Sequence, residues 1–395
     1  MSLTNTPAAE RPHIAFFGLR NAGKSSVVNA ITNQEVSLVS AVAGTTTDPV
    51  AKSMELLPLG PVVLIDTPGI DDVGTLGTER VRRARNVLNK ADLAVLVVDA
   101  TLGLQTADRE LLALFAARNI PCVVARNKMD APNPQPVDAG EVPCLDVSAL
   151  TGEGIHELKE KMAALLNAGK VDRPLVRDLV GTHDVVVLVT PIDAAAPKGR
   201  LILPQQMALR DILDAGAMPL CVRETEYAAA LAALAAPPRL VITDSKVFRE
   251  VNALTPAAVP LTSFSILMAR YKGLLDDAVA GARALEDLRD GDTILISEGC
   301  THHRQCDDIG TVRLPRMLGN YTGKHLQFAF SSGGHFPEDL TPFKLVVHCG
   351  GCMLNAREMR SRALQAADER KPMTNYGIAM AQMTGILDRC VAVFG

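Results

Sequence analysis

The feature that most constrains this chain is the segment GLRNAGKS at residues 18–25, which fits the phosphate-loop pattern G-x-x-x-x-G-K-[ST]. It follows a short apolar run and precedes an apolar-rich helical stretch, the strand–loop–helix context that the motif needs. Gly18 and Gly23 let the backbone turn its N–H groups toward phosphate oxygens at a helix N-terminus. Lys24 then reaches the β- and γ-phosphates, and the Ser25 hydroxyl ligates Mg²⁺. The segment predicts a nucleotide-binding α/β domain.

Two further motifs follow predicted strands in the order that a guanine-nucleotide site requires. In Asp66–Gly69, the Asp66 carboxylate can hold Mg²⁺ through water and the Gly69 N–H can sense the γ-phosphate. In Asn127–Asp130, the Asp130 carboxylate can accept two hydrogen bonds from the N1–H and the N2 amine of guanine. Adenine lacks that pair of donors, so the sequence predicts a guanine nucleotide.

Two further segments complete the predicted nucleotide site. Ser148–Leu150 suits the loop behind the base, and Thr45–Asp48 supplies a further Mg²⁺ ligand through the Thr46 hydroxyl. We expect Lys24 and Thr46 to assist hydrolysis of the nucleotide. The predicted contacts to GTP, GDP and Mg²⁺ are Gly18, Asn21, Ala22, Gly23, Lys24, Ser25, Ser26, Thr45, Thr46, Asp66, Gly69, Asn127, Lys128, Asp130, Ser148 and Ala149.

These motifs, over residues 11–165, resemble the translation-factor-related GTPases, especially the branch of the tRNA-modification (MnmE/TrmE) and Era-like proteins. Ras-type proteins place a water-orienting Gln after D-x-x-G, whereas this chain has Ile70, which cannot hydrogen-bond water. In the resembling branch an Asn of the phosphate loop helps to hold a K⁺ that does the work of an arginine finger, and Asn21 stands at that position. The resemblance also implies that Asp72, or its neighbour Asp71, positions the attacking water.

The whole chain is predicted to form three α/β regions. Apolar runs that alternate with helical patterns are typical of a mostly parallel sheet wrapped by helices. The predicted strands lie at 13–17, 62–65, 93–98, 122–125, 184–190, 219–223, 239–243, 259–263, 292–297, 326–331 and 344–348. The main predicted helices beyond the first region lie at 204–215, 226–235, 246–253, 266–288 and 353–370.

Composition limits the classes of function. With 40 Lys and Arg against 44 Asp and Glu, the 395 residues carry a net charge of −4, and no basic patch stands out that would bind nucleic acid. The longest apolar stretches have strand length, well short of the roughly 18–20 residues of a membrane span. The first residues lack the apolar core of a secretory signal. We therefore expect a cytoplasmic protein without membrane or nucleic-acid partners, whose thiols stay reduced.

A cysteine and histidine pattern marks the C-terminal region. Cys349 and Cys352 follow a predicted strand that ends in His348, and two intervening glycines let both thiolates reach one metal centre. Cys300 and His302 also come shortly after a predicted strand. Two strand ends with soft ligands in one region predict a single site between them. Three cysteines and a histidine would suit Zn²⁺, and three cysteines with an exchangeable fourth position would suit a 4Fe–4S cluster.

The GTPase motifs, the α/β middle region and the cysteine–histidine pattern together resemble the HydF family, the maturation GTPases of FeFe-hydrogenases, over essentially the whole chain. The resemblance implies α/β domains throughout: a P-loop GTPase domain with a parallel-rich sheet (1–167), a linker (168–182), a small dimerisation domain (183–262) and an iron–sulfur cluster-binding domain (263–395). It implies a 4Fe–4S cluster held by Cys300, Cys349 and Cys352. His302 or His348 is the candidate fourth ligand.

The same resemblance implies a scaffold and carrier that forms a homodimer. A dinuclear iron precursor with CO and CN⁻ ligands is assembled near the cluster with two radical-SAM maturases, and it then passes to apo FeFe-hydrogenase. An iron that lacks a thiolate can take a labile ligand, whereas a four-cysteine site would be closed. GTP hydrolysis would act as a timing switch through Thr45–Asp48 and Asp66–Asp72.

Two alternatives stay open. One is an RNA- or ribosome-associated GTPase with a structural Cys₃His zinc domain, and the other is a redox-sensing switch in which the metal centre controls GTP turnover. Most of the remaining cysteines lie in apolar sequence contexts, which favour packing over metal binding. Cys122, Cys144, Cys221 and Cys390 are expected in the hydrophobic core, and Cys306 is left unassigned.

Overall fold

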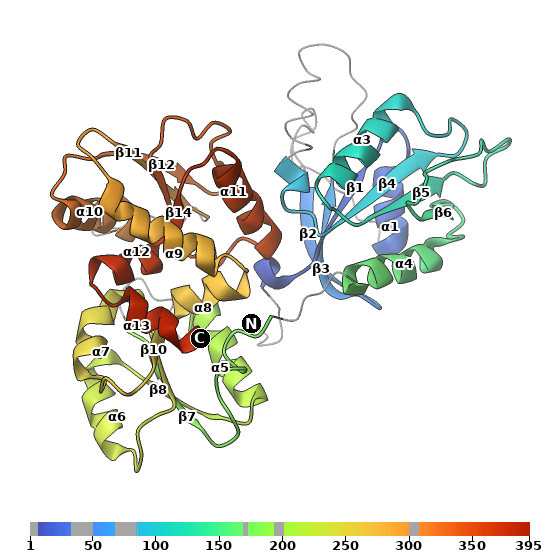
Figure 1. Cartoon of the computed structure of the whole chain (residues 1–395). Coiled ribbons are helices and arrows are strands. Elements are labelled where there is room, and N and C mark those ends of the chain that lie inside the picture. The colour runs from blue at the N-terminus through green and yellow to red at the C-terminus, as the bar shows by residue number, and fades with distance from the viewer. Residues whose placement is uncertain are drawn as a thin grey trace. The chain divides into compact units, whose positions relative to one another are not determined.

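The chain forms two compact units, Met1–Val171 and Asp172–Gly395, in a computed structural model (Figure 1). The structure describes residues 7–32, 50–67, 84, 86–168, 173–192, 201–299 and 308–395. Both units are α/β, as the sequence predicts.

A six-stranded sheet of order β2-β3-β1-β4-β5-β6 forms the centre of the first unit. β2 runs antiparallel to β3, and the other neighbours pair in parallel. Its strands are β1 (His13–Phe17), β2 (Val50–Leu56), β3 (Gly60–Asp66), β4 (Leu93–Asp99), β5 (Cys122–Asn127) and β6 (Cys144–Asp146). The carboxyl ends of parallel strands share one edge of a sheet, so the segments that follow β1, β3 and β5 meet there.

Helices cover both faces of this sheet. The helices are α1 (Lys24–Thr32), α3 (Thr106–Ala117) and α4 (Ile155–Ala168). α1 and α4 pack on one face and α3 on the other. β4 is apolar from Leu93 to Val98 and buried along that run, because a parallel sheet between two helical layers exposes neither face.

The second unit holds two four-stranded parallel sheets, of order β10-β9-β7-β8 and β12-β11-β13-β14. Their strands are β7 (Val185–Val189), β8 (Met218–Val222), β9 (Leu240–Thr243), β10 (Leu261–Ser263), β11 (Thr293–Glu298), β12 (Gln327–Ser332), β13 (Leu345–His348) and β14 (Met373–Asn375). The helices are α5 (Leu203–Asp214), α6 (Tyr227–Ala233), α7 (Phe248–Leu254), α8 (Phe264–Tyr271), α9 (Leu275–Arg283), α10 (Leu314–Thr322), α11 (Ala356–Asp368), α12 (Tyr376–Met383) and α13 (Leu387–Val391).

One hydrophobic core reaches both sheets of the second unit. Val187 and Val241 from the first sheet belong to the same cluster of buried residues as Ile294 and Val347 from the second. α12 contributes Ile378 to that cluster, and Figure 1 shows α12 and α13 between the two sheets. The two regions that the sequence separates therefore pack as one body.

Several predicted elements change in the structure. The helix predicted over 266–288 is two helices, α8 and α9, because Gly273 takes a φ of +72° and turns the chain between them. The helix predicted from residue 353 begins at Ala356, where the Asn355 side chain accepts the N–H of Glu358 as an N-cap. Sequence patterns missed β2, β6 and β14. β6 and β14, at three residues each, are too short to show an alternation.

The expectation that four cysteines pack in the core is wrong for two of them. Cys122 and Cys390 are buried, but Cys144 and Cys221 are exposed. Both exposed thiols lie on edge strands, β6 and β8, which have a neighbouring strand on one side only. Apolar neighbours in the sequence do not show whether a strand lies at the edge or in the middle of its sheet.

Part of the predicted linker belongs to the second unit. Leu175 and Val176 are buried beside α5 and α8. The Asp211 carboxylate accepts the backbone N–H groups of residues 175–177 at 2.7–3.0 Å, which fixes this segment on α5.

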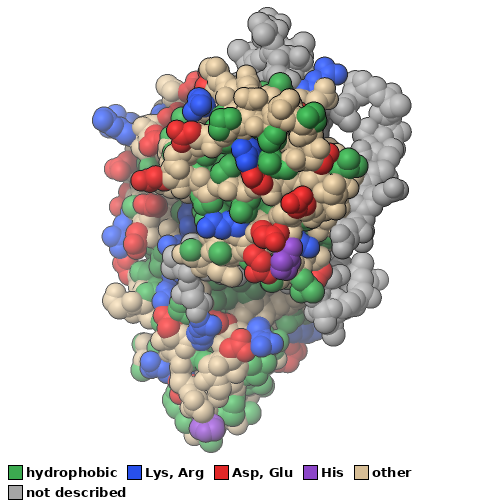
Figure 2. Space-filling model, turned by 90° about the vertical axis from the view of Figure 1, so that its right-hand side faces the viewer, with side chains coloured by type: hydrophobic (Ala, Val, Ile, Leu, Met, Phe, Trp, Pro, Cys, Tyr) green, Lys and Arg blue, Asp and Glu red, His purple; other side chains and the backbone are tan. Residues whose placement is uncertain are grey.

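Figure 2 shows acidic and basic side chains interspersed over the face that it draws. No helix within the described ranges is long and apolar enough to cross a membrane.

Candidate functional site

The phosphate loop joins β1 to α1 in a conformation that needs its glycines. Gly18 has a φ of +141° and Gly23 a φ of +90°. A Cβ atom at Gly18 would overlap the Val97 carbonyl oxygen, and one at Gly23 would overlap the side-chain amide of Asn127. Asn21 also has a positive φ, of 61°, within the loop. The loop therefore passes too close to neighbouring strands for side chains at either glycine.

The Lys24 side chain folds back against the phosphate loop. The residue is 8% exposed, and Nζ donates to the carbonyl oxygens of Gly18 at 3.0 Å and Leu19 at 2.8 Å. The ammonium is thus held where the loop would surround phosphate oxygens, which are better partners for a cation than neutral carbonyls.

Ser25 and Asp66 meet at the start of α1 and the end of β3. The Ser25 hydroxyl donates to Asp66 Oδ2 at 2.7 Å. The other oxygen, Oδ1, is buried and has no hydrogen-bond partner among the described residues, and burial raises the pKa of the Asp66 carboxyl. An orphaned carboxylate oxygen beside a hydroxyl is the kind of donor set that a hard cation satisfies, so these residues fit Mg²⁺.

The predicted base-binding residues are linked to the phosphate loop. Asn127 donates from Nδ2 to the Ala22 carbonyl at 3.0 Å and accepts the Ala149 N–H at 3.0 Å. The Ser148 hydroxyl donates to Asp130 Oδ1 at 2.5 Å, which orients that carboxylate. The Lys128 ammonium pairs with Asp99 Oδ2 at 2.5 Å.

Five predicted residues of the nucleotide site lie outside the described residues. They are Thr45, Thr46, Gly69, Asp71 and Asp72.

The proposed cluster site lies where β11 and β13 end. These strands are parallel neighbours, with Ser297 opposite His348, so their carboxyl ends meet. The Gly299 N–H donates to Cys349 Sγ at 3.0 Å, and the Gly351 N–H donates to the same sulfur at 3.4 Å. Gly299 directly precedes Cys300, and Cys300 and His302 lie outside the described residues.

The environment of Cys349 fits an iron–sulfur centre. Backbone N–H groups that point at a ligand sulfur are a feature by which proteins tune such clusters. Burial raises the pKa of the Cys349 thiol, so a thiolate there needs a metal or a cation to stabilise it. Among the described residues no three His, Cys, Asp or Glu side chains form a metal-binding group, and Cys349 and Cys352 are two ligands short of a complete set.

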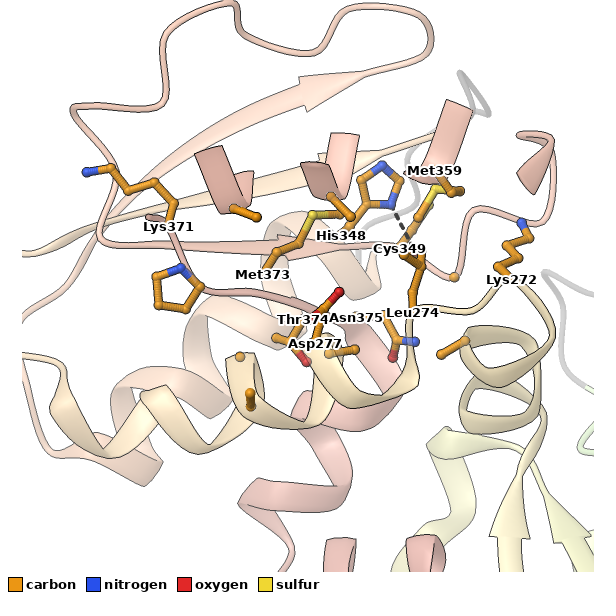
Figure 3. A pocket seen from close by; sticks show the side chains of 18 of the residues that line it. Lys272, Leu274, Asp277, His348, Cys349, Met359, Lys371, Met373, Thr374 and Asn375 are labelled. Atoms are coloured by element: carbon orange, nitrogen blue, oxygen red, sulfur yellow. Dashed lines mark hydrogen bonds between the residues drawn. The ribbon is translucent and has the colours of Figure 1, made fainter. Parts of the chain in front are cut away.

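His348 is fully buried and both of its ring nitrogens have protein partners. Nδ1 lies 2.7 Å from the Cys349 carbonyl oxygen, which is the dashed contact in Figure 3. Nε2 lies 2.9 Å from Arg362 Nη1. Arg362 is always protonated and can only donate, so Nε2 accepts and Nδ1 carries the proton. Burial, together with the nearby Arg362 charge, lowers the pKa of His348 to about 3, so the ring is neutral.

Two side chains that the sequence did not single out brace the Cys349–Cys352 loop. The Lys272 residue is 2% exposed, and Nζ donates to the Gly351 carbonyl at 2.5 Å and to the Leu354 carbonyl at 3.0 Å. Arg362 also donates to the Glu358 carboxylate at 2.8 Å, which neutralises its buried charge. The carbonyls that Lys272 binds lie up to 82 residues away, and the His348 ring that Arg362 contacts lies fourteen residues away, so no local pattern marks these contacts.

Three family models match the chain. The model described as hydrogen maturase F dimerization domain matches residues 175–273, and the one described as hydrogen maturase F tetramerization domain matches residues 276–393. A model described as 50S ribosome-binding GTPase matches residues 13–128.

Curated GTPases and solved GTPase structures match part of the chain. The tRNA modification GTPase MnmE of Koribacter versatilis is 28% identical over 209 residues, which is 51% of this chain and 45% of that protein. MnmE of Moorella thermoacetica is 35% identical over 181 residues, 41% of this chain and 37% of that protein. The chain thus spans less than half the length of these relatives. A crystal structure of Aquifex aeolicus Era is 21% identical, with a TM-score of 0.34, covering 53% of this chain and 92% of that one.

The two hydrogen maturase F models follow one another along nearly all of the second unit, and the GTPase model precedes them. The chain belongs to the hydrogen maturase F (HydF) family.

Proposed function

We propose that this protein is a GTP-hydrolysing scaffold and carrier for assembly of the FeFe-hydrogenase H-cluster. The observation that carries the proposal is the 3.0 Å contact from the Gly299 N–H to Cys349 Sγ. It brings the residue before Cys300 to the sulfur of the C-x-x-C loop, in a chain whose second unit matches hydrogen maturase F models.

The first unit would bind and hydrolyse GTP. Lys24 and the loop N–H groups would hold the phosphates, and Ser25, Thr46 and Asp66 would hold Mg²⁺ directly or through water. Asp130, oriented by Ser148, would select guanine. Two roles come from the related GTPases alone: Asn21 as a K⁺ ligand, and Asp72 or Asp71 as the residue that positions water.

The second unit would hold a 4Fe–4S cluster through Cys300, Cys349 and Cys352. When bound, the cluster supplies an iron with a replaceable fourth ligand. His302 remains the candidate for that position. Because Arg362 and the Cys349 carbonyl engage both nitrogens of His348, we assign His348 the role of orienting the loop.

GTP turnover would time the contacts with partner proteins. In GTPases, two switch segments are ordered by the γ-phosphate and released on hydrolysis. Residues 45–48 and 66–72 would form those segments in this chain. The partners would be apo FeFe-hydrogenase, two radical-SAM maturases and a second copy of the chain bound through residues 175–273, in a reducing cytoplasm. The dinuclear iron precursor is the cargo.

Metal analysis after anaerobic purification and reconstitution tests the proposal against the zinc alternative. The proposal expects about four irons and four sulfides per chain. One zinc and no sulfide would favour the ribosome-associated GTPase instead. A loaded protein that fails to activate apo-hydrogenase, with iron and GTP turnover intact, would leave a redox-sensing GTPase as the better reading.

A further inference from the structure

The last residue of β4, Asp99, lies beside the predicted base-binding motif at residues 127–130, and the function proposed so far gives it no role. β4 and β5 are parallel neighbours with Asp99 opposite Asn127, and the Ala100 N–H donates to the Asn127 carbonyl at 2.8 Å. The next residue of the motif is Lys128, whose ammonium lies 2.5 Å from Asp99 Oδ2. The end of β4 therefore meets the side chain of a predicted nucleotide contact.

The Asp99 carboxylate is itself held in place. Its other oxygen, Oδ1, accepts the Thr101 N–H at 2.9 Å and the Thr101 hydroxyl at 2.7 Å. The Asp99 side chain is 12% exposed, against 37% for Lys128. Burial alone would raise the pKa of Asp99, but the hydrogen bonds from Lys128 and Thr101 lower it below its ordinary value. A charged and oriented carboxylate thus faces the Lys128 ammonium.

The backbone of Lys128 is constrained as well. Its φ is +68°, in the left-handed region that a residue with a side chain seldom adopts. Such a conformation persists where the surrounding contacts determine it. Asn127 donates to the phosphate loop, and Asp130 accepts the Ser148 hydroxyl. These contacts fix where the Lys128 side chain starts, and Asp99 fixes where it ends.

The side chains of the motif suit different surfaces of a guanine nucleotide. Asn127 is 2% exposed and engaged in protein contacts, and the Asp130 carboxylate suits the N1–H and N2 amine at the edge of the base. The methylene stem and charged end of Lys128 suit the flat face of the purine ring. A long side chain loses rotamer freedom when it binds, and an ion pair that already holds the ammonium reduces that loss.

We propose that Asp99 is a positioning residue for guanine binding, which holds the Lys128 ammonium so that the lysine stem lies against the face of the base. The inference rests on the GTP binding proposed above. Asp99 acts through Lys128 and touches no part of the nucleotide. Its loss weakens the nucleotide complex more than it slows the chemical step of bound GTP.

A double-mutant cycle on the full-length protein tests this pairing. Asp99→Asn removes the charge and keeps an oxygen for Thr101, and Lys128→Met removes the ammonium and keeps an apolar stem. We expect each variant to raise the Kd for GDP about tenfold, and the double variant to raise it about tenfold as well rather than about a hundredfold. Titration calorimetry measures these Kd values. Asp146→Asn removes a carboxylate that pairs with Arg126 between β5 and β6, and this matched control should bind GDP like the parent.

Inosine diphosphate separates an effect through Lys128 from one through Asp130. It lacks the N2 amine, which the Asp130 carboxylate would bind, and it keeps the face of the ring. Asp99→Asn should therefore weaken the binding of GDP and of inosine diphosphate by the same factor. In steady-state assays with GTP, the same variant should raise KM about tenfold and change kcat by less than about twofold.

The outcomes separate this inference from the GTPase function. A parent-like Kd in Asp99→Asn, a double variant whose Kd rises by both factors multiplied, or a smaller factor for inosine diphosphate than for GDP overturns the positioning role and leaves the GTPase function standing. A parent protein that binds no GDP overturns the GTPase function itself. If circular dichroism shows that Asp99→Asn does not fold, Thr101→Val decides, because it removes one of the contacts that orient Asp99. It should raise the Kd for GDP about threefold in the parent and leave it unchanged in Lys128→Met.

Discussion

Gly299 and Cys349 are fifty positions apart in the chain, and the backbone N–H of the first donates to the sulfur of the second at 3.0 Å. The contact exists because β11 and β13 are parallel neighbours and end together. It joins the two sequence segments that carry the predicted cluster ligands, so it makes Cys349 the most informative cysteine to change.

Cys349→Ser should lose most of its cluster iron and the visible absorption of the cluster, because a serine oxygen is a poor substitute for a soft thiolate ligand. GTP turnover should stay near the parent value, since the nucleotide residues belong to the other unit. Iron analysis and a phosphate-release assay check both parts. Cys221→Ser, at an exposed thiol on β8, is the control. A Cys349→Ser protein with a full cluster would contradict the ligand assignment.

Lys24→Ala should abolish GTP turnover and leave the iron content unchanged. The substitution removes the buried ammonium that lies against Gly18 and Leu19, and with it the charge that meets the β- and γ-phosphates. Phosphate release and iron analysis on the same preparation measure the two results. Lys161→Ala, a lysine on α4, controls for loss of charge. Loss of iron together with turnover would argue that the two units do not work separately.

K⁺ dependence tests Asn21. The parent should hydrolyse GTP faster in K⁺ than in Na⁺ at equal ionic strength, because the amide oxygen of Asn21 would ligate the larger ion. Asn21→Gly accepts the φ of 61° at this position without strain and removes the amide. It should hydrolyse slowly and equally in both salts. Equal rates for the parent would remove the role given to Asn21.

Lys272→Met should destabilise the second unit by about 2–4 kcal/mol, because it leaves the buried carbonyls of Gly351 and Leu354 without their donor. Urea unfolding monitored by circular dichroism measures the change, and iron retention during dialysis shows whether the cluster loop loosens. Lys371→Met removes a lysine whose ammonium donates to one carbonyl at an exposed site, and should cost less. Equal stability of the Lys272→Met variant and the parent would show that Lys272 does not brace the loop.

The meeting of Ser25 and Asp66 could be predicted from the sequence because each lies in a short motif directly after a predicted strand. Ser25 and Asp66 are 41 positions apart, yet the parallel sheet brings the Ser25 hydroxyl to 2.7 Å from Asp66 Oδ2. Recognising the two strands that precede them is enough to predict this approach. The close approach of Gly299, which precedes Cys300, to Cys349 is predictable for the same reason, because β11 and β13 are adjacent strands that end together.

The surroundings of the cluster loop could not be predicted in this way. His348 follows the pattern of a ligand, but its nitrogens are taken by Arg362, fourteen residues away on α11, and by the Cys349 carbonyl. Lys272 and Thr374 are ordinary polar residues in the sequence, and only the packing of α8, α11 and β14 buries them. Burial of single polar groups depends on contacts between distant elements, which local patterns do not encode.

Thiol labelling of the folded, cluster-loaded protein tests the positions of the cysteines outside the metal site. At pH 8, iodoacetamide should modify Cys144 and Cys221, which are exposed, and should spare Cys122 and Cys390. Burial raises the pKa of each of the spared thiols to about 12, so little thiolate is present to react. Peptide mass spectrometry assigns the modified sites, and unfolding in urea should make Cys122 and Cys390 reactive. Rapid modification of either one in the folded protein would contradict its place in the core, and protection of Cys221 alone would show that another surface covers β8.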